Sequence, residues 1–570
     1  VGVIARLIKH KSSTIRRKAL VLFNERLIAH RADLSRDETA LFVQMVGDIT
    51  PLLSAAAAAD DSETAVNQQT ALLSLEILSR SFAKRESAVF FSTVPVVMAA
   101  AQHPNTQVSA TALVCLATLC AELGPQMLGH LPKIVSISLD ASRATLGNAT
   151  QQSDLPEPKQ LFMLSALTLS QELLVALPQF MSPYLPALLA VSLHAAMPVD
   201  AATGGQLGKK NATVLDLIGQ KCAPRVVIPA ITAYFGDCKA APRSHAVVPL
   251  FELAGRIASR LDRPAVTAHH AELFDLFIGG LELRSAQLIP ADEVDATEDA
   301  VTDAVVQLVV KMNETLFRPM LLRVVTWATG EEKTPRRLIT FFRLTNKVAE
   351  QLKSIFVPFF AMFFTNVVDE FGAVASYVAP TASSASTKKG KRSRAQADAE
   401  QANAQLLNAA EAELLWTSML ATIHRVMVHD TEHFFDRERF DAIMQPLVDQ
   451  LESPLAGDGE QRYPNLCAHV VPVLGQLAVT VSNDSMWKSL NHQTLLLTRS
   501  GQSDVRRGAL RCLQEYYTRL GEEFLILLPE TIPFLAEVLE DAEHDVEQLA
   551  HEVVAQIEKV LGEPLKKYFA

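Results

Sequence analysis

Residues 503–510 read Ser-Asp-Val-Arg-Arg-Gly-Ala-Leu, and the Asp-Val pair of this stretch returns at Asp545 and Val546. The step from Val505 to Val546 is 41 residues, within the period of roughly 40–47 residues that is typical of HEAT and armadillo repeats. Each such repeat is a pair of helices. Asp504 and Asp545 occupy the positions at which an N-cap carboxylate would accept hydrogen bonds from the first amides of a helix.

The helices that this pattern predicts carry their apolar residues on one face. In one helix, apolar residues recur at Val505, Ala509, Cys512, Tyr516 and Leu520, and in the partner helix they recur at Leu528, Ile532, Leu535 and Leu539. These are helical spacings, so each helix presents a single stripe that a lone pair cannot bury. We therefore expect the pairs to stack and to bury Leu535 between them.

The same unit recurs in the amino-terminal half of the chain. Val66 and Val108 open two similar helices and stand 42 residues apart. Prolines in a first helical turn, or at a helix kink, are expected in the segments 131–134, 185–188, 228–231 and 357–360. The sequence predicts an all-α fold, a HEAT/armadillo-like α-solenoid of stacked antiparallel helix pairs.

The composition agrees with stacked helices. Of the 570 residues, 49% are hydrophobic and only 6% are aromatic, and no segment alternates in the manner of a β-strand. The six cysteines form no CxxC pair, which favours reduced, buried thiols. The uncharged runs 87–121 and 173–199 are interrupted by prolines, so we expect buried hairpins and no membrane partner. The chain opens without Met, and we expect it to be the carboxyl-terminal piece of a longer protein.

The character of the sequence changes between residues 379 and 404, where helical periodicity is lost. We expect a disordered linker there, between a HEAT-repeat array at 1–378 and a second array at 405–570. The linker carries a basic run, which suits a nuclear-import signal or a nucleic-acid tether: Lys388, Lys389, Lys391, Arg392 and Arg394. A plain solvated linker is the alternative.

Several short motifs resemble catalytic sites, but none is complete. The glycine-rich segment 204–210 has the wrong spacing for a phosphate loop. His429, Glu432 and His433 match the H-x-x-E-H pattern of a zinc peptidase, in which the histidines bind metal and the glutamate is the general base. A third ligand and a cleft are not evident, and the context indicates a helix end followed by a turn. We predict no enzyme, metal, cofactor or small-molecule substrate, with a zinc peptidase as the remote alternative.

One predicted helix, between Pro335 and Pro358, has a basic side. Arg336, Arg343 and Lys347 are spaced by seven and four residues and share a face, while Phe341, Phe342 and Leu352 lie on the other. Such a face could bind phosphates or an acidic partner through electrostatic contacts. An ordinary solvated helix face is the alternative, since the net charge of the chain is −11.

Three blocks of sequence resemble a known family. Residues 314–328 read Glu-Thr-Leu-Phe-Arg-Pro-Met-Leu-Leu-Arg-Val-Val-Thr-Trp-Ala, and the block continues through 337–344 and 349–360. Together with the ends at 16–24 and 521–565, these residues resemble the carboxyl-terminal region of the very large HEAT-repeat, U3 snoRNA-associated family of the small-subunit processome, in its UtpA (t-Utp) subcomplex. The block itself covers about 314–372.

The resemblance implies a non-catalytic nucleolar scaffold that joins nascent pre-rRNA, helps early small-subunit processing and is linked to rDNA transcription. The implied partners are WD-repeat UtpA components and the pre-rRNA or snoRNP, and the implied location is the nucleus and nucleolus. Periodicity alone would also allow another HEAT-repeat scaffold, such as a nuclear-transport receptor or a phosphatase-type adaptor.

Overall fold

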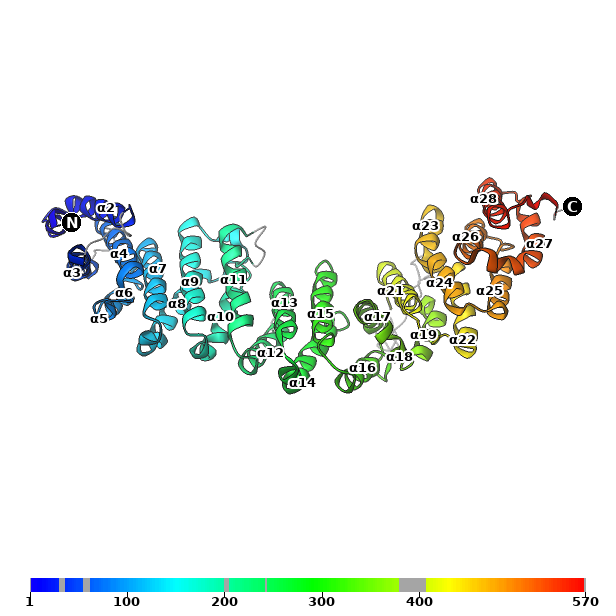
Figure 1. Cartoon of the computed structure of the whole chain (residues 1–570), viewed down its shortest axis with the longest axis horizontal. Helices are drawn as coiled ribbons and strands as arrows, with labels where there is room; N and C mark the ends of the chain where they lie inside the picture. Colours follow the sequence, from blue (N-terminus) through cyan, green and yellow to red (C-terminus); the bar gives the residue numbers. More distant parts are fainter. Residues whose placement is uncertain are drawn as a thin grey trace, which may run out of the picture. The chain divides into compact units, whose positions relative to one another are not determined.

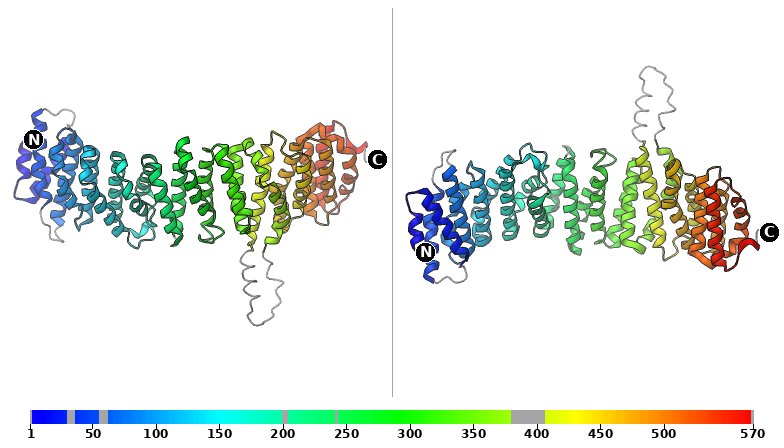
Figure 2. Two further views of the ribbon diagram at one scale, coloured as in Figure 1. Left: turned by 90° about the horizontal axis from the view of Figure 1, so that it is seen from below. Right: turned by 90° about the horizontal axis from the view of Figure 1, so that it is seen from above.

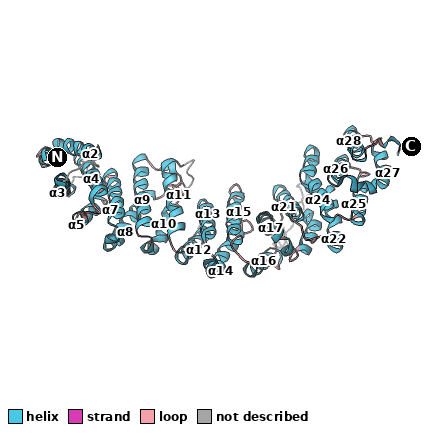
Figure 3. Ribbon diagram, viewed as in Figure 1, coloured by secondary structure: helices cyan, strands magenta, loops and turns pink. Residues whose placement is uncertain are grey.

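A computed structural model describes residues 2–29, 36–54, 62–198, 204–240, 243–378 and 406–567 of the chain. These ranges consist of helices and the turns that join them (Figure 3). They contain no β-strand, apart from a single bridge between Val378 and Leu407. The predicted all-α solenoid is confirmed.

The chain divides into two compact units. Unit one comprises Val1–Phe277 and Leu288–Lys311, and unit two comprises Ile278–Gln287 and Met312–Ala570. Helix α14 (Arg263–Leu281) therefore begins in the first unit and ends in the second. In each unit the helices lie side by side in rows (Figures 1 and 2).

Unit one stacks successive helix pairs so that the second helices of the pairs form one row. In this second-helix row each member packs against the next. Its members are α2 (Ser13–Ala29), α4 (Ser62–Phe82), α7 (Thr106–Leu123), α9 (Glu157–Ala176), α11 (Gly205–Lys221), α13 (Ser244–Arg260) and α15 (Val294–Val309). The first helices are α1 (Gly2–Ile8), α3 (Arg36–Leu53), α5 (Ser87–Phe91), α6 (Val94–Ala100), α8 (Leu131–Leu146), α10 (Leu185–Ser192) and α12 (Pro224–Ala240).

Helix α7 illustrates how the sequence sets a repeat. The Asn105 side chain accepts hydrogen bonds from the amides of Gln107 and Val108 and so caps the helix start. Gly124 ends the helix at a φ of 52°, a conformation that favours glycine. Between these ends α7 is apolar on almost every side because α4 and α9 both pack against it.

Unit two repeats this arrangement. Its second-helix row contains α17 (Pro335–Leu352), α21 (Ala409–Val428), α24 (Val471–Val481), α26 (Ser503–Leu520) and α28 (His544–Leu561), each packed against the next. The remaining helices are α16 (Glu314–Thr329), α18 (Val357–Phe360), α19 (Phe364–Ala373), α22 (Arg437–Val448), α23 (Arg462–Asn465), α25 (Asp484–Leu497) and α27 (Leu528–Val538).

The repeat that predicted the fold lies at α26, α27 and α28. Leu535 is 0% exposed, which confirms its predicted burial between the stacked helices. The N-cap assignment was wrong by two residues. The caps are Gln502 and Glu543, and Asp504 and Asp545 lie in the first turns, where their charges complement the helix dipoles.

Three of the four predicted prolines lie in a first helical turn. Pro132, Pro186 and Pro358 occupy the first turns of α8, α10 and α18, and Pro529 likewise lies in the first turn of α27. Pro229 instead lies inside α12, which already begins at Pro224. Pro224 occupies the first position of this helix, where a proline is well tolerated.

The predicted linker 379–404, with its basic run 388–394, lies outside the described residues. The helices on either side of it belong to the same compact unit, and α17 packs against α21. The helical stack of unit two therefore continues from one side of this segment to the other.

Candidate interaction surfaces

Helix α17 carries the predicted basic face. Thr334 caps it by accepting a hydrogen bond from the Arg337 amide, and Pro335 occupies its first turn. Phe341 and Phe342 are buried, as their spacing predicted, whereas Leu352 is half-buried. The helix is buried on most sides, since α16 and α21 both contact it.

The basic side chains of the predicted face are more buried, and make more contacts within the protein, than the sequence indicated. Arg336 donates from Nε to Glu411 at 2.9 Å, and the two side chains are only 16% and 18% exposed. Arg343 and Lys347 are half-buried, and both contact other residues. Arg336 is thus a structural ion pair within unit two, and RNA binding by the three residues stays a prediction.

Glu282 organises a polar cluster that sequence reasoning missed. Its carboxylate accepts hydrogen bonds from Trp327 Nε1 at 2.6 Å, from Arg337 Nε at 3.0 Å and from the Ser285 hydroxyl. Arg337 also lies over the Trp327 ring, 5.6 Å from its centroid. This cluster joins the end of α14 to α16 and α17 within unit two.

Hydrogen bonding and burial shift the pKa of Glu282 in opposite directions, and the hydrogen bonds have the larger combined effect. Burial alone would raise the pKa of Glu282, but donation from Ser285, Trp327 and Arg337, together with the Arg337 charge, holds the pKa below its usual value. A carboxyl group with a depressed pKa stabilises the fold above its unfolded pKa of about 4.3, and this contribution is lost as the pH falls through the folded pKa.

We expect Glu282→Gln to flatten the loss of stability of unit two on acidification below about pH 4.3. All three tryptophans, Trp327, Trp416 and Trp487, lie in unit two, so urea unfolding followed by their fluorescence reports on it. Glu331→Gln, at an exposed position of the same unit, is the control. An equal slope of unfolding free energy against pH in both variants would contradict this role of Glu282.

A second carboxylate, that of Glu370, is buried in the same unit. It is 3% exposed, forms an ion pair with Lys333 and accepts a hydrogen bond from the Tyr377 hydroxyl at 2.8 Å. Lys333 precedes α17, whereas Glu370 lies on α19. The pair therefore connects the start of one helix to the middle of another.

A cluster of phenylalanines packs in the core of the same unit. Phe363 lies at its centre, with ring centroids 5.1 Å from Phe341, 6.3 Å from Phe356 and 4.9 Å from Phe360. Phe360 and Phe364 extend the cluster to Phe434 at 5.9 Å and 6.0 Å. Edge-on ring pairs of this kind stabilise a core beyond the area that they bury.

The H-x-x-E-H segment belongs to this cluster and lacks the geometry of a zinc site. Helix α21 ends at Val428, and His433 has a φ of 56°, so the two histidines do not share a helical turn. The Asp430 carboxylate accepts hydrogen bonds from the amides of Phe434 and Phe435, which holds both rings in the cluster. The described residues contain no group of three metal-ligating side chains.

The cysteines and the glycine-rich segment occupy structural positions in the fold. Cys467 and His469 lie on one π-helical turn, Leu466–Val470, where His469 faces the Trp416 ring. Gly204 is the N-cap residue of α11, so the described part of the glycine-rich segment forms the start of a helix. Cys467 is half-buried and the remaining five cysteines are buried.

Two apolar stretches among the described residues, Thr106–Gly129 and Gly459–Val481, are long enough to cross a membrane by length and composition. They are 67% and 44% buried inside the protein. Core helices commonly pass this test, and α7 of the first stretch packs between two helices of unit one.

The fold defines the chain as a HEAT-type helical-repeat protein. The BP28CT (NUC211) domain family matches residues 265–435, which include the Glu282 and Glu370 groups and the phenylalanine cluster. This segment contains the block 314–372 that was singled out from the sequence.

Several longer proteins are similar to the whole chain. HEAT repeat-containing protein 1 of Danio rerio is 31% identical over 100% of this chain and 26% of its own length, and that of Homo sapiens is 30% identical over 100% and 25%. The U3 small nucleolar RNA-associated protein 10 of Schizosaccharomyces pombe is 24% identical over 98% and 30%. The chain thus spans about a quarter to a third of the length of these relatives.

Among solved structures, Kap95p bound to RanGDP shares 14% identity, covering 99% of this chain and 67% of that chain, with a TM-score of 0.39. A likeness this low carries no inference about partners. The nuclear-transport alternative therefore gains nothing from it.

Proposed function

We propose that this protein is a non-catalytic scaffold in small-subunit ribosome biogenesis. In this role it helps to assemble the processome on nascent pre-rRNA and supports early small-subunit rRNA processing and rDNA transcription. The observation that carries the proposal is the similarity of the whole chain to proteins named for their association with U3 small nucleolar RNA. The solenoid fits the role, because stacked repeats present long surfaces to several partners.

The partners in this proposal are other proteins of a pre-ribosomal particle, including WD-repeat UtpA components, and the location is the nucleus and nucleolus. The basic run 388–394 supplies the chemistry of an import signal in the sequence. The domain division at 379–404 and the role of this run remain parts of the proposal.

Depletion of the protein in its native cell tests the function. We expect unprocessed small-subunit pre-rRNA to accumulate. Precursors of the large subunit should mature normally, after correction for any change in rDNA transcription. The full-length gene should restore processing. Normal small-subunit processing after complete depletion would contradict the proposal.

Direct RNA contact through Arg343 and Lys347 is a narrower proposal. Arg336 is left out of its test, because reversing that charge would place a carboxylate beside Glu411 and disturb the fold. Arg343→Gln with Lys347→Gln should weaken binding to RNA of any sequence and lower the salt slope by roughly one unit per phosphate contact. Unchanged binding of an oligouridylate at low salt would identify the face as structural.

A further inference from the structure

A row of glutamine side chains crosses unit one along the second-helix row. Gln69, Gln107, Gln160 and Gln206 lie on the successive helices α4, α7, α9 and α11. Gln69 donates from Nε2 to Oε1 of Gln107 at 3.3 Å, which joins the first two members directly. We call these four residues the amide row.

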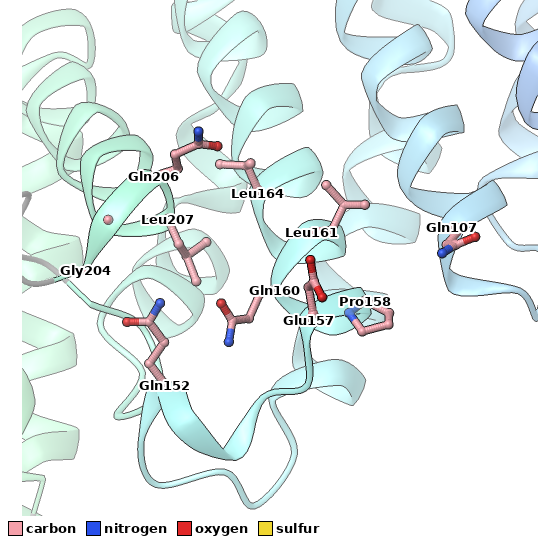
Figure 4. Close-up of a pocket in the computed structure, with 11 residues that line it drawn as sticks. Gln107, Gln152, Glu157, Pro158, Gln160, Leu161, Leu164, Gly204, Gln206 and Leu207 are labelled. Carbon is pink, nitrogen blue, oxygen red and sulfur yellow. The ribbon is translucent and has the colours of Figure 1, made fainter.

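The last three members of the amide row line one pocket of about 560 Å³, together with Gln152. Figure 4 shows Gln107 and Gln206 on opposite sides of this pocket, with Gln160 between them and Gln152 below Gln206. Gln107 and Gln206 are exposed, so their amides are accessible from solvent.

The amides of the row retain hydrogen-bonding capacity. Gln107 uses its carbonyl oxygen as an acceptor, which leaves both hydrogens of its Nε2 available. Gln160 donates from Nε2 to the Leu155 carbonyl at 2.8 Å, which leaves its Oε1 as an acceptor. Primary amides that offer donors and acceptors in turn match a peptide backbone, in which each residue has one N–H and one C=O.

The charge and the apolar character of the pocket indicate which class of ligand fits it. Among the described residues, Glu157 is the one charged side chain that lines it, so the pocket offers no cation to a phosphate. Leu161 is 48% exposed at the same place and supplies an apolar contact. A nucleic-acid backbone is thus poorly matched, and a polypeptide without acidic side chains is well matched.

From these features we infer that the amide row binds an extended segment of a partner protein through its main chain. Packed helices lie about 8–10 Å apart, and an extended chain advances about 3.3 Å per residue. Each helix of the row therefore meets roughly every third residue, and the four helices, which span three such intervals, engage a segment of roughly eight to ten residues. The inference is independent of the proposed ribosomal function.

The test begins with selection of displayed random peptides of about 12 residues on the purified full chain. We expect some selected peptides to lose about tenfold or more in affinity for Gln107→Ala/Gln206→Ala, which alters two exposed side chains and spares the fold. Adding Gln160→Ala should weaken binding further. Gln220→Ala/Gln307→Ala, at two exposed positions outside the pocket, should leave binding unchanged.

N-methylation of alternate backbone amides of a selected peptide tests the main-chain contact. The modification removes N–H donors and keeps every side chain, so binding should fall about tenfold or more for one of the two registers. Equal affinity of both methylated registers would overturn the inference. So would selection that yields no peptide sensitive to the amide row, or an oligouridylate whose binding depends on Gln107 and Gln206.

Discussion

Replacing Phe363 with alanine is expected to destabilise unit two by about 3–5 kcal/mol, the usual range for a buried phenylalanine. Phe363 is 1% exposed and contacts the rings of Phe341, Phe356 and Phe360, which come from different parts of α17 and the segment that follows it. Truncation leaves a cavity whose walls are held by several helices and cannot collapse freely.

Urea unfolding followed by tryptophan fluorescence measures this loss, since the three tryptophans all lie in unit two. Ile355→Ala is the control, because Ile355 lies nearby in sequence and is 66% exposed. Its stability should stay within about 0.5 kcal/mol of the parent protein. Equal stabilities of the two variants would show that the phenylalanine cluster is not a packed core.

Lys333→Met is expected to cost a similar amount, about 3–5 kcal/mol, through a different mechanism. The substitution leaves the Glu370 carboxylate buried, with the Tyr377 hydroxyl as the remaining donor described for it. A buried carboxylate without its countercharge is far less stable than the ion pair.

The double variant Lys333→Met/Glu370→Met separates charge from packing. Removing both charges leaves no uncompensated carboxylate, so the double variant should be more stable than Lys333→Met alone. A double variant as unstable as the single one would mean that side-chain packing, and not the ion pair, accounts for the loss. Both stabilities can be read from the same fluorescence transition.

The fold could be predicted because helical periodicity is a local signal. The apolar positions from Val505 to Tyr516 lie within one helix, and the same pattern one repeat later marks the neighbour that covers it. Helix boundaries were harder to place. Asp504 has the chemistry of a cap, yet the helix begins before it, since boundaries depend on where the backbone turns.

The polar contacts could not be predicted because their partners are distant in sequence. Arg336 meets Glu411, 75 residues away, and Arg337 meets Glu282, 55 residues away. Arg336, Arg337 and Glu411 occupy polar helix positions, which a solvated helix face would explain equally well. For the same reason, the sequence predicted Arg336 as an exposed cation on the helix surface.

The amide row was hidden for a related reason. One glutamine per repeat is an ordinary surface residue, and only Gln69 and Gln107, 38 residues apart, are joined by a hydrogen bond. Loops of unequal length separate the helices, so the glutamines have no regular spacing in sequence. Stacking of the helices, and not the sequence period, brings them into one row.

Affinity purification of the tagged protein from its native cell tests the central claim most directly. Quantification of the co-purified RNA should show enrichment of U3 snoRNA and of small-subunit pre-rRNA over a tagged nuclear control protein. Large-subunit precursors that lack the small-subunit sequence should stay at the level of the control. Recovery of U3 snoRNA and pre-rRNA no higher than with the control would contradict the account of this chain as a scaffold of early small-subunit assembly.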